Sequence, residues 1–272
     1  MKVFMWLRDE LGLLNKLIRP ILPLTGGFGA WIIARACGAD AQTAKAAAVA
    51  IGASAIGASF WHYGAANRMY ARKHERIEFQ DPDILKLMGL ATFWFSINVA
   101  QSMLPEACTY ICTFNLVVIA AYSEKLASDW TTKNLTMAIV SATPIIIGWQ
   151  AGKFRHPMVP WTIALTMLVH LAHEIVKDVR DRKANEGIRV TLPMVITNEG
   201  ALQVAGAALL VATVLPLFLL RFTGTPIQRD MIIFSMTVFL LTAMWLIIRK
   251  QQIGVCKNLM KLGLCFTIAA LI

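Results

Sequence analysis

Charged side chains are scarce in this sequence. They make up 15% of the 272 residues, against about a quarter of a typical soluble domain. This scarcity excludes an ordinary soluble globular protein. Hydrophobic residues make up 57% of the chain, and most charges fall between long apolar runs, as in helical membrane proteins. A spanning helix needs about 20 mostly apolar residues, because in lipid its backbone must satisfy its own hydrogen bonds.

Metal-binding and disulfide patterns are also lacking. Cys108 and Cys112 lie one helical turn apart in an apolar run, and the other three cysteines are scattered. We interpret the cysteines as small apolar side chains, and we predict neither a disulfide nor a metal site from them. The stretch HEIVK at 173–177 lacks the second histidine of HExxH. The sequence therefore does not predict a zinc protease.

The chain carries a formal charge of +10, which raises the question of nucleic-acid binding. The distribution of the basic residues argues against it. They lie at the edges of the apolar segments, where they fix topology and attract anionic lipid or phosphate. We therefore predict membrane lipid as a partner and no nucleic acid.

Nine apolar segments predict an all-α, polytopic membrane protein with nine transmembrane helices in one domain, residues 1–272. Pro105 lies between the third and fourth segments, where a helix is expected to start. The first twelve residues are mixed and resemble an interfacial amphipathic segment, so we expect no cleavable signal peptide. The nine segments cover residues 17–37, 44–66, 85–103, 105–122, 134–151, 157–176, 199–220, 229–248 and 255–272.

The basic residues also predict the orientation. With the N-terminus in the cytoplasm, about twenty of the 26 lysines and arginines fall on the cytoplasmic side, as the positive-inside rule requires. We therefore expect a protein of a bacterial or archaeal-type inner or cell membrane. Its two most polar loops, 67–86 and 177–198, then both open on the cytoplasmic face.

The later loop begins with HEIVKDVRDRKAN, which we interpret as a continuation of the sixth helix. Helical spacing places Glu174, Asp178, Asp181 and Asn185 on roughly one face. Oxygen ligands of this kind suit Mg²⁺, and the lysines and arginines among them suit phosphate. A solvated helix end with mixed charges is the alternative. Against it, Glu174 is expected at or inside the interface, where a buried charge is costly and usually functional.

The earlier loop reads NRMYARKHERIEFQDPD. Asn67, Ala71 and Glu75 share one helical face, and a stripe of arginines, which includes Arg68 and Arg72, runs beside it. This arrangement is compatible with a metal held next to a phosphate. Taken alone, it equally predicts a salt-bridged, solvated helix end.

Together the two loops resemble those of the UbiA superfamily of intramembrane prenyltransferases. Members have nine helices and two cytoplasmic acidic motifs, typically NDxxDxxxD and KDxxDxxGD, the second followed by TLP. The second motif is present here as Lys177, Asp178, Asp181 and Asn185, with TLP at 191–193. Weaker matches extend the resemblance along the chain: Arg19-Pro20, Tyr122-Ser123 with Lys125, and Asn134-Leu135.

The sequence departs from the family pattern in both motifs. Arg68, Ala71 and Glu75 stand where the first motif has aspartates, and Asn185 replaces the last aspartate of the second. Strong carboxylates are then left at Glu75, Asp178 and Asp181. Since each lost carboxylate removes negative charge, we expect a weakened affinity for metal.

The resemblance implies Mg²⁺-dependent transfer of an isoprenoid chain from a prenyl diphosphate to a hydrophobic acceptor within the membrane. The acceptor would be aromatic, a quinone precursor or a lipid. It implies catalytic roles for Asp178, Asp181 and Lys177. The implied metal ligands are Asn67, Glu75, Asp178, Asp181 and Asn185. The implied diphosphate ligands are Arg72, Lys125, Lys177, Arg189 and Tyr122.

Two other functions remain open from the sequence. UbiA-type terpene cyclases have a small residue where the middle aspartate of the first motif usually stands, as Ala71 does here. A non-catalytic paralogue that binds an isoprenoid or assists assembly is also compatible with the eroded motifs. A transporter is disfavoured, because few charges lie inside the apolar segments.

Overall fold

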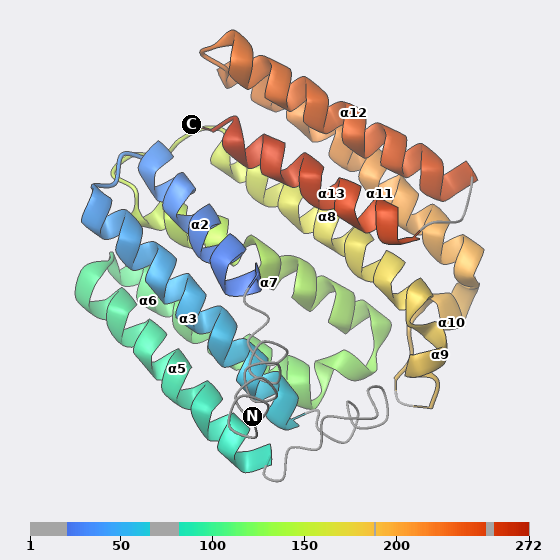
Figure 1. Cartoon of the computed structure of the whole chain (residues 1–272), viewed down its shortest axis with the longest axis horizontal. Helices are drawn as coiled ribbons and strands as arrows, with labels where there is room; N and C mark the ends of the chain where they lie inside the picture. Colours follow the sequence, from blue (N-terminus) through green and yellow to red (C-terminus); the bar gives the residue numbers. More distant parts are fainter. Residues whose placement is uncertain (1–20, 66–81, 188, 249–252, 272) are drawn as a thin grey trace, which may run out of the picture.

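The computed structural model describes residues 21–65, 82–187, 189–248 and 253–271, and in these ranges every regular element is a helix (Figure 1). The prediction of an all-α protein is thereby confirmed. The elements are α2 (Ile21–Ala36), α3 (Ala41–Ala65), α5 (Pro82–Met103), α6 (Glu106–Glu124), η1 (Leu126–Ser128), α7 (Trp130–Ala151), α8 (Val159–Arg180), α9 (Arg182–Asn185), α10 (Leu192–Ile196), α11 (Asn198–Leu219), η2 (Leu220–Phe222), α12 (Pro226–Ile248) and α13 (Ile253–Ala269).

Six of these helices are long and apolar enough to cross a bilayer, namely α3, α5, α6, α8, α11 continued by η2, and α12. The other three predicted spans coincide in position with α2, α7 and α13. Of these, α7 opens with the polar residues Thr131, Thr132, Lys133 and Asn134. The number of nine membrane crossings therefore stays a prediction.

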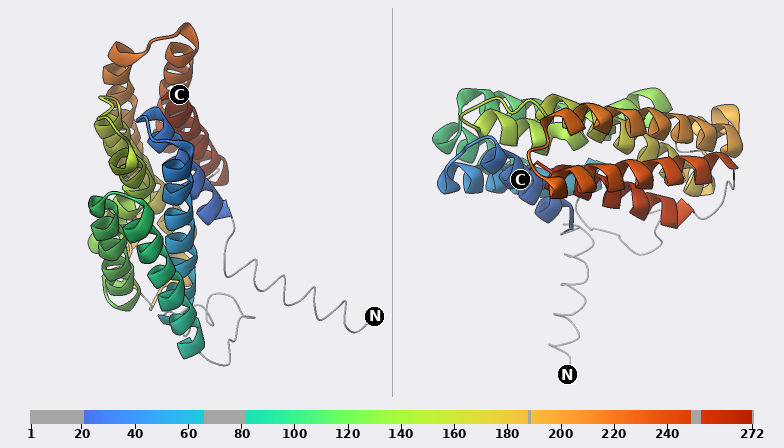
Figure 2. Two further views of the ribbon diagram at one scale, coloured as in Figure 1. Left: turned by 90° about the vertical axis from the view of Figure 1, so that its left-hand side faces the viewer. Right: turned by 90° about the horizontal axis from the view of Figure 1, so that it is seen from above.

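The long helices form a bundle with two groups (Figures 1 and 2). In one group α3 packs against α2 and α5, and in the other α11 packs against α8 and α12. Helix α7 contacts both α2 and α8, so it joins the two groups. The helices approach closely at Gly148 of α7, where an added Cβ would lie 2.5 Å from the carbonyl oxygen of Ala30. Only glycine permits this contact, as is common between membrane helices.

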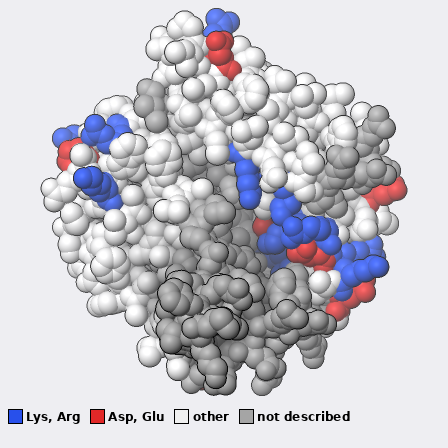
Figure 3. Space-filling model, viewed as in Figure 1, with Lys and Arg blue, Asp and Glu red and all other residues white. Residues whose placement is uncertain are grey.

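The outer surface of the bundle is largely apolar. Large hydrophobic side chains such as Phe28, Trp94, Val117, Ile227 and Leu241 are exposed there. Charged atoms gather at a few places on the visible face, among them the end near α9 and α10, whereas most of the described surface is uncharged (Figure 3). Such a surface suits lipid rather than water.

The motif helix does not continue as predicted. α8 ends at Arg180, Asp181 forms its C-cap with φ −94° and ψ 12°, and the separate short α9 follows. The prediction of one continuous helix through Asn185 is therefore wrong. A turn at Asp181 changes the direction of the chain in the middle of the motif, after which Gly187 adopts a positive φ of 71°.

Candidate functional site

The end of α8 carries charged side chains that are buried or partly buried. Asp178 is fully buried and Glu174 is 5% exposed, while Lys177 is partly buried and lies 3.2 Å from a carboxylate oxygen of Glu174. A buried carboxylate is costly unless it is paired. The burial of Asp178 and Glu174 therefore distinguishes this helix end from the solvated alternative.

Lys133 in the first turn of α7 is also fully buried. Its ammonium lies 2.5 Å from Oδ1 of Asp178 and 3.6 Å from Oε2 of Glu174. It also donates to the side-chain oxygen of Asn134 at 3.1 Å. One lysine from α7 thus neutralises two acids of α8.

Local structure explains how Lys133 comes to point at α8. Asp129 caps α7, and its side chain accepts hydrogen bonds from the backbone amides of Thr131 and Thr132. These hydrogen bonds, of which the one from the Thr132 amide has the largest effect, hold the pKa of Asp129 below its usual value because they stabilise the charged carboxylate. Lys133 lies in the turn that this cap stabilises, and its side chain extends from there to Asp178 of α8.

Several buried polar atoms here have no hydrogen-bond partner among the described residues. They include Oδ2 of Asp178 and Nδ2 of Asn134. The side-chain Oδ1 of each residue accepts a hydrogen bond from the ammonium of Lys133. Because buried polar atoms are normally satisfied, the second oxygen of Asp178 is suited to coordinate an additional cation.

The remaining residues of the second motif have other partners. The carboxylate of Asp181 accepts from Nε and Nη2 of Arg180 at 2.8 and 3.3 Å. Asn185 is buried, and its side-chain oxygen accepts from Nε of Arg189 at 3.1 Å. The predicted phosphate ligand Arg189 thus lies next to the predicted metal ligand Asn185.

Other predicted phosphate ligands come from the end of α6. Tyr122 is buried there, with its ring 5.6 Å from that of His62 of α3, whereas Lys125 is exposed. The backbone amide of Val190 donates to the carbonyl of Ser128 at 3.0 Å. This bond ties the segment after α9 to the connection between α6 and α7.

The first motif lies outside the described residues. The predicted ligands Asn67, Arg72 and Glu75 belong to it, as do Arg68 and Ala71. Their roles therefore stay predictions.

The donors of the second motif fit Mg²⁺ in kind but are few in number. Asp178, Asp181 and Asn185 all offer oxygen, which Mg²⁺ prefers. Within the described ranges, however, no group of three or more histidine, cysteine, aspartate or glutamate side chains is placed to hold a metal. A complete coordination shell would need ligands from the first motif, from a substrate or from water.

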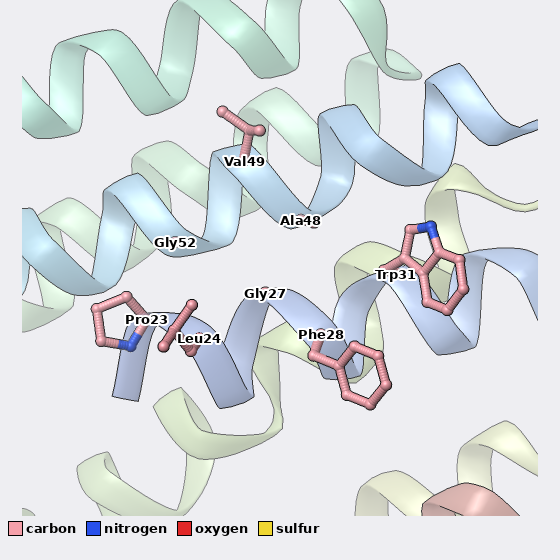
Figure 4. Close-up of a pocket in the computed structure, with 8 residues that line it drawn as sticks. All are labelled: Pro23, Leu24, Gly27, Phe28, Trp31, Ala48, Val49 and Gly52. Carbon is pink, nitrogen blue, oxygen red and sulfur yellow. The ribbon is translucent and has the colours of Figure 1, made fainter. Parts of the chain in front are cut away.

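An apolar groove of about 390 Å³ lies between α2 and α3, away from these charges. Figure 4 shows Pro23, Phe28 and Trp31 on α2, and Val49 on α3. None of its lining residues is charged. The groove therefore offers no group for diphosphate chemistry, and the charged cluster at the end of α8 is the candidate site.

The sequence matches the model of the UbiA prenyltransferase family over residues 81–264. The chain belongs to this family. No curated protein matches the sequence significantly. The predicted superfamily is thereby confirmed, and with its apolar helices this UbiA protein is an integral membrane protein.

Solved structures share the fold over nearly the whole chain. A structure titled for digeranylgeranylglyceryl phosphate synthase has a TM-score of 0.77 at 15% identity, covering 97% of both chains. A UbiA homologue from Archaeoglobus fulgidus bound to DMAPP and Mg²⁺ has a TM-score of 0.68 at 12% identity, covering 94% of this chain and 98% of its own. An apo UbiA homologue from Aeropyrum pernix K1 has a TM-score of 0.68 at 15% identity, with coverages of 94% and 96%.

Sequence reasoning missed Lys133 as part of the site of this UbiA protein. Lys133 directly precedes the apolar segment 134–151, where a basic side chain is expected to fix topology. A usable signal was nevertheless present. Lys133 immediately precedes Asn134-Leu135, which is itself one of the stretches that resemble the family.

Proposed function

We propose that this UbiA protein transfers an isoprenoid chain from a prenyl diphosphate to a hydrophobic acceptor inside the membrane, with Mg²⁺ as cofactor. The acceptor would be aromatic, a quinone precursor or a lipid. The observation that carries the proposal is the buried Asp178 at the end of α8, which has one carboxylate oxygen without a partner among the described residues. A buried carboxylate of this kind, in a family of prenyltransferases, suits a diphosphate–metal site.

The charged residues would act on the leaving diphosphate. Negative charge develops on it as the allylic carbon–oxygen bond breaks, and fixed cations stabilise that charge. In this proposal Lys177 contacts the departing oxygens, because it is only partly buried beside Glu174. Further diphosphate ligands would be Arg72, Lys125, Arg189 and Tyr122.

The acidic residues would hold the cofactor. Asp178, Asp181 and Asn185 would supply oxygen ligands from the second motif, and Asn67 and Glu75 from the first. When bound, Mg²⁺ supplies Lewis-acid polarisation of the diphosphate oxygens. We therefore assign catalytic roles to Asp178 and Asp181, because they would hold Mg²⁺ near the departing diphosphate.

The helices would protect the carbocation from water. The core around α8, α11, α12 and α13 includes the apolar residues Val169, Leu202, Leu209 and Phe239, and exclusion of water prevents hydrolysis of a reactive intermediate.

We place the motif loops on the cytoplasmic side, because the positive-inside rule favours that orientation.

Incubation of the purified protein with farnesyl or geranylgeranyl diphosphate and Mg²⁺ tests the proposal. Release of diphosphate with a product that depends on an added acceptor supports prenyl transfer. Asp181→Ala should abolish turnover, whereas Asp40→Ala, in the exposed connection between α2 and α3, should not. Full activity of Asp181→Ala would contradict the site assignment.

A terpene cyclase is the second candidate, favoured by Ala71 at the position of the middle aspartate. In a cyclase a double bond of the substrate tail attacks the cation, so diphosphate release would give a hydrocarbon without an acceptor. No release from any prenyl chain length would instead favour a non-catalytic isoprenoid-binding protein. The same assay therefore separates all three functions.

A further inference from the structure

Each carboxylate at the end of α8 already has a basic partner. Asp178 contacts Lys133, Glu174 contacts Lys177, and Asp181 contacts its neighbour Arg180. These contacts offset the negative charge of the second motif with side chains of the protein itself. A site built mainly to attract divalent cations would be expected to keep an excess of negative charge.

The pair of Lys133 and Asp178 is the most tightly placed of these contacts. Both side chains are completely buried, so the ammonium has little freedom to move away, and water screens it poorly. A divalent ion on the other oxygen of Asp178 would lie close to this ammonium. The two positive charges would repel each other, and the repulsion grows as the local dielectric constant falls.

The sequence changes the charge of the site in the same direction. Asn185 carries no charge where the family motif has an aspartate, and its side-chain oxygen accepts a hydrogen bond from Arg189. The buried ammonium of Lys133 and the uncharged side chain of Asn185 both leave the second motif less negative. Lys133 and Asn185 therefore change the charge of the motif in the same direction.

We propose that Lys133 is a built-in counter-cation of the second acidic motif. Its ammonium neutralises Asp178 without a metal and lowers the affinity of the motif for Mg²⁺. Lys133 is thus a positioning residue, which acts through Asp178. The inference rests on the proposed function only in treating this motif as the cation-binding part of the site.

Mg²⁺ titration of the purified protein without any prenyl substrate tests the inference. Thermal unfolding would be followed in EDTA and with increasing Mg²⁺ for the wild type and for Lys133→Met. The variant removes the ammonium and keeps a long apolar side chain. Lys153→Met is the matched control, because this exposed lysine lies just beyond the opposite end of α7.

In EDTA, Lys133→Met should unfold at a lower temperature than the wild type, because Asp178 loses its buried partner. Mg²⁺ should then stabilise the variant with a midpoint at least about tenfold lower than in the wild type, because the repulsion is gone. Lys153→Met should match the wild type in both measurements. An unchanged midpoint in Lys133→Met, or loss of a response that the wild type shows, would overturn the inference.

A double variant keeps the test informative if Lys133→Met alone does not fold. Lys133→Met with Asp178→Asn also removes the carboxylate that Lys133→Met leaves buried and unpaired, so the double variant should fold and should unfold in EDTA at a higher temperature than Lys133→Met. It should also lack the tighter Mg²⁺ response. A double variant no more stable than Lys133→Met would contradict the charge pairing. Failure of the wild type to release diphosphate would count against the proposed enzyme and leave these titrations unaffected.

Discussion

Lys177 is the residue whose role is most directly testable by activity. It is partly exposed at the end of α8 and donates to both oxygens of Glu174 at 3.2 and 3.3 Å. Its ammonium can therefore turn to a bound diphosphate without leaving a buried position.

Replacing Lys177 by methionine should weaken binding of the prenyl diphosphate. A hydrogen bond to a charged group contributes about 1.5–3 kcal/mol, which corresponds to a roughly ten- to hundredfold loss in kcat/KM. Steady-state kinetics with varied prenyl diphosphate would measure it, with Lys153→Met as the control. Unchanged kcat/KM in Lys177→Met would show that this lysine does not contact the substrate.

The sequence predicted the residue types of the site better than their partners. Lys177, Asp178, Asp181 and Asn185 were identified from spacing and resemblance. Lys177 and Asp178 lie in the last turn of α8, Asp181 is its C-cap, and Asn185 ends α9; their roles stay predictions. The contact with Lys133 was not predictable in the same way. It joins side chains 45 positions apart, so it depends on how α7 packs against α8 rather than on any local pattern.

Among the elements, α7 matters most for the site, because it carries Lys133 and contacts both groups of helices. Its position depends on Gly148, where an added Cβ would also lie 2.8 Å from the Cβ of Ile33. A side chain there must push α2 and α7 apart.

Gly148→Ala should therefore destabilise the protein, at a cost of about 1–3 kcal/mol for overpacking. Gly29→Ala is a matched control in α2, since nothing lies within 4 Å of an added Cβ there. The melting temperature in detergent, followed by circular dichroism, would compare the two variants. Equal melting temperatures would show that α2 and α7 separate without cost.

Local signals located the elements more reliably than they defined their ends. Pro105 is the N-cap of α6, as its place between two apolar segments predicted. The end of α8 was missed because helical spacing alone continues through Asp181 to Asn185. Helical spacing gives no sign of the later return of the chain, which is a tertiary feature: the Val190 amide donates to the carbonyl of Ser128.

For the whole molecule, the orientation in the membrane is open to a direct test. Asp40 lies in the connection between α2 and α3, and Glu186 follows α9, at opposite ends of the bundle (Figure 1). Both positions are exposed. Single cysteines at these sites, in a Cys265→Ser background, would report which end faces the cytoplasm.

A membrane-impermeant maleimide should label Asp40→Cys in intact cells. It should label Glu186→Cys only after permeabilisation, because the positive-inside rule places the basic loops in the cytoplasm. The other native cysteines are buried and should remain unreactive. The reverse labelling pattern would invert the predicted topology.

The backbone bond from Val190 to Ser128 joins two segments that both lead to charged residues of the site. The two bonded residues are 62 positions apart in the chain. One segment leads into α7, which carries Lys133, and the other follows α9 and carries Arg189. A distortion that breaks this bond frees each segment to move relative to the other. Substitutions in the α6–α7 connection should therefore alter the behaviour of the acidic motif even where they touch none of its side chains.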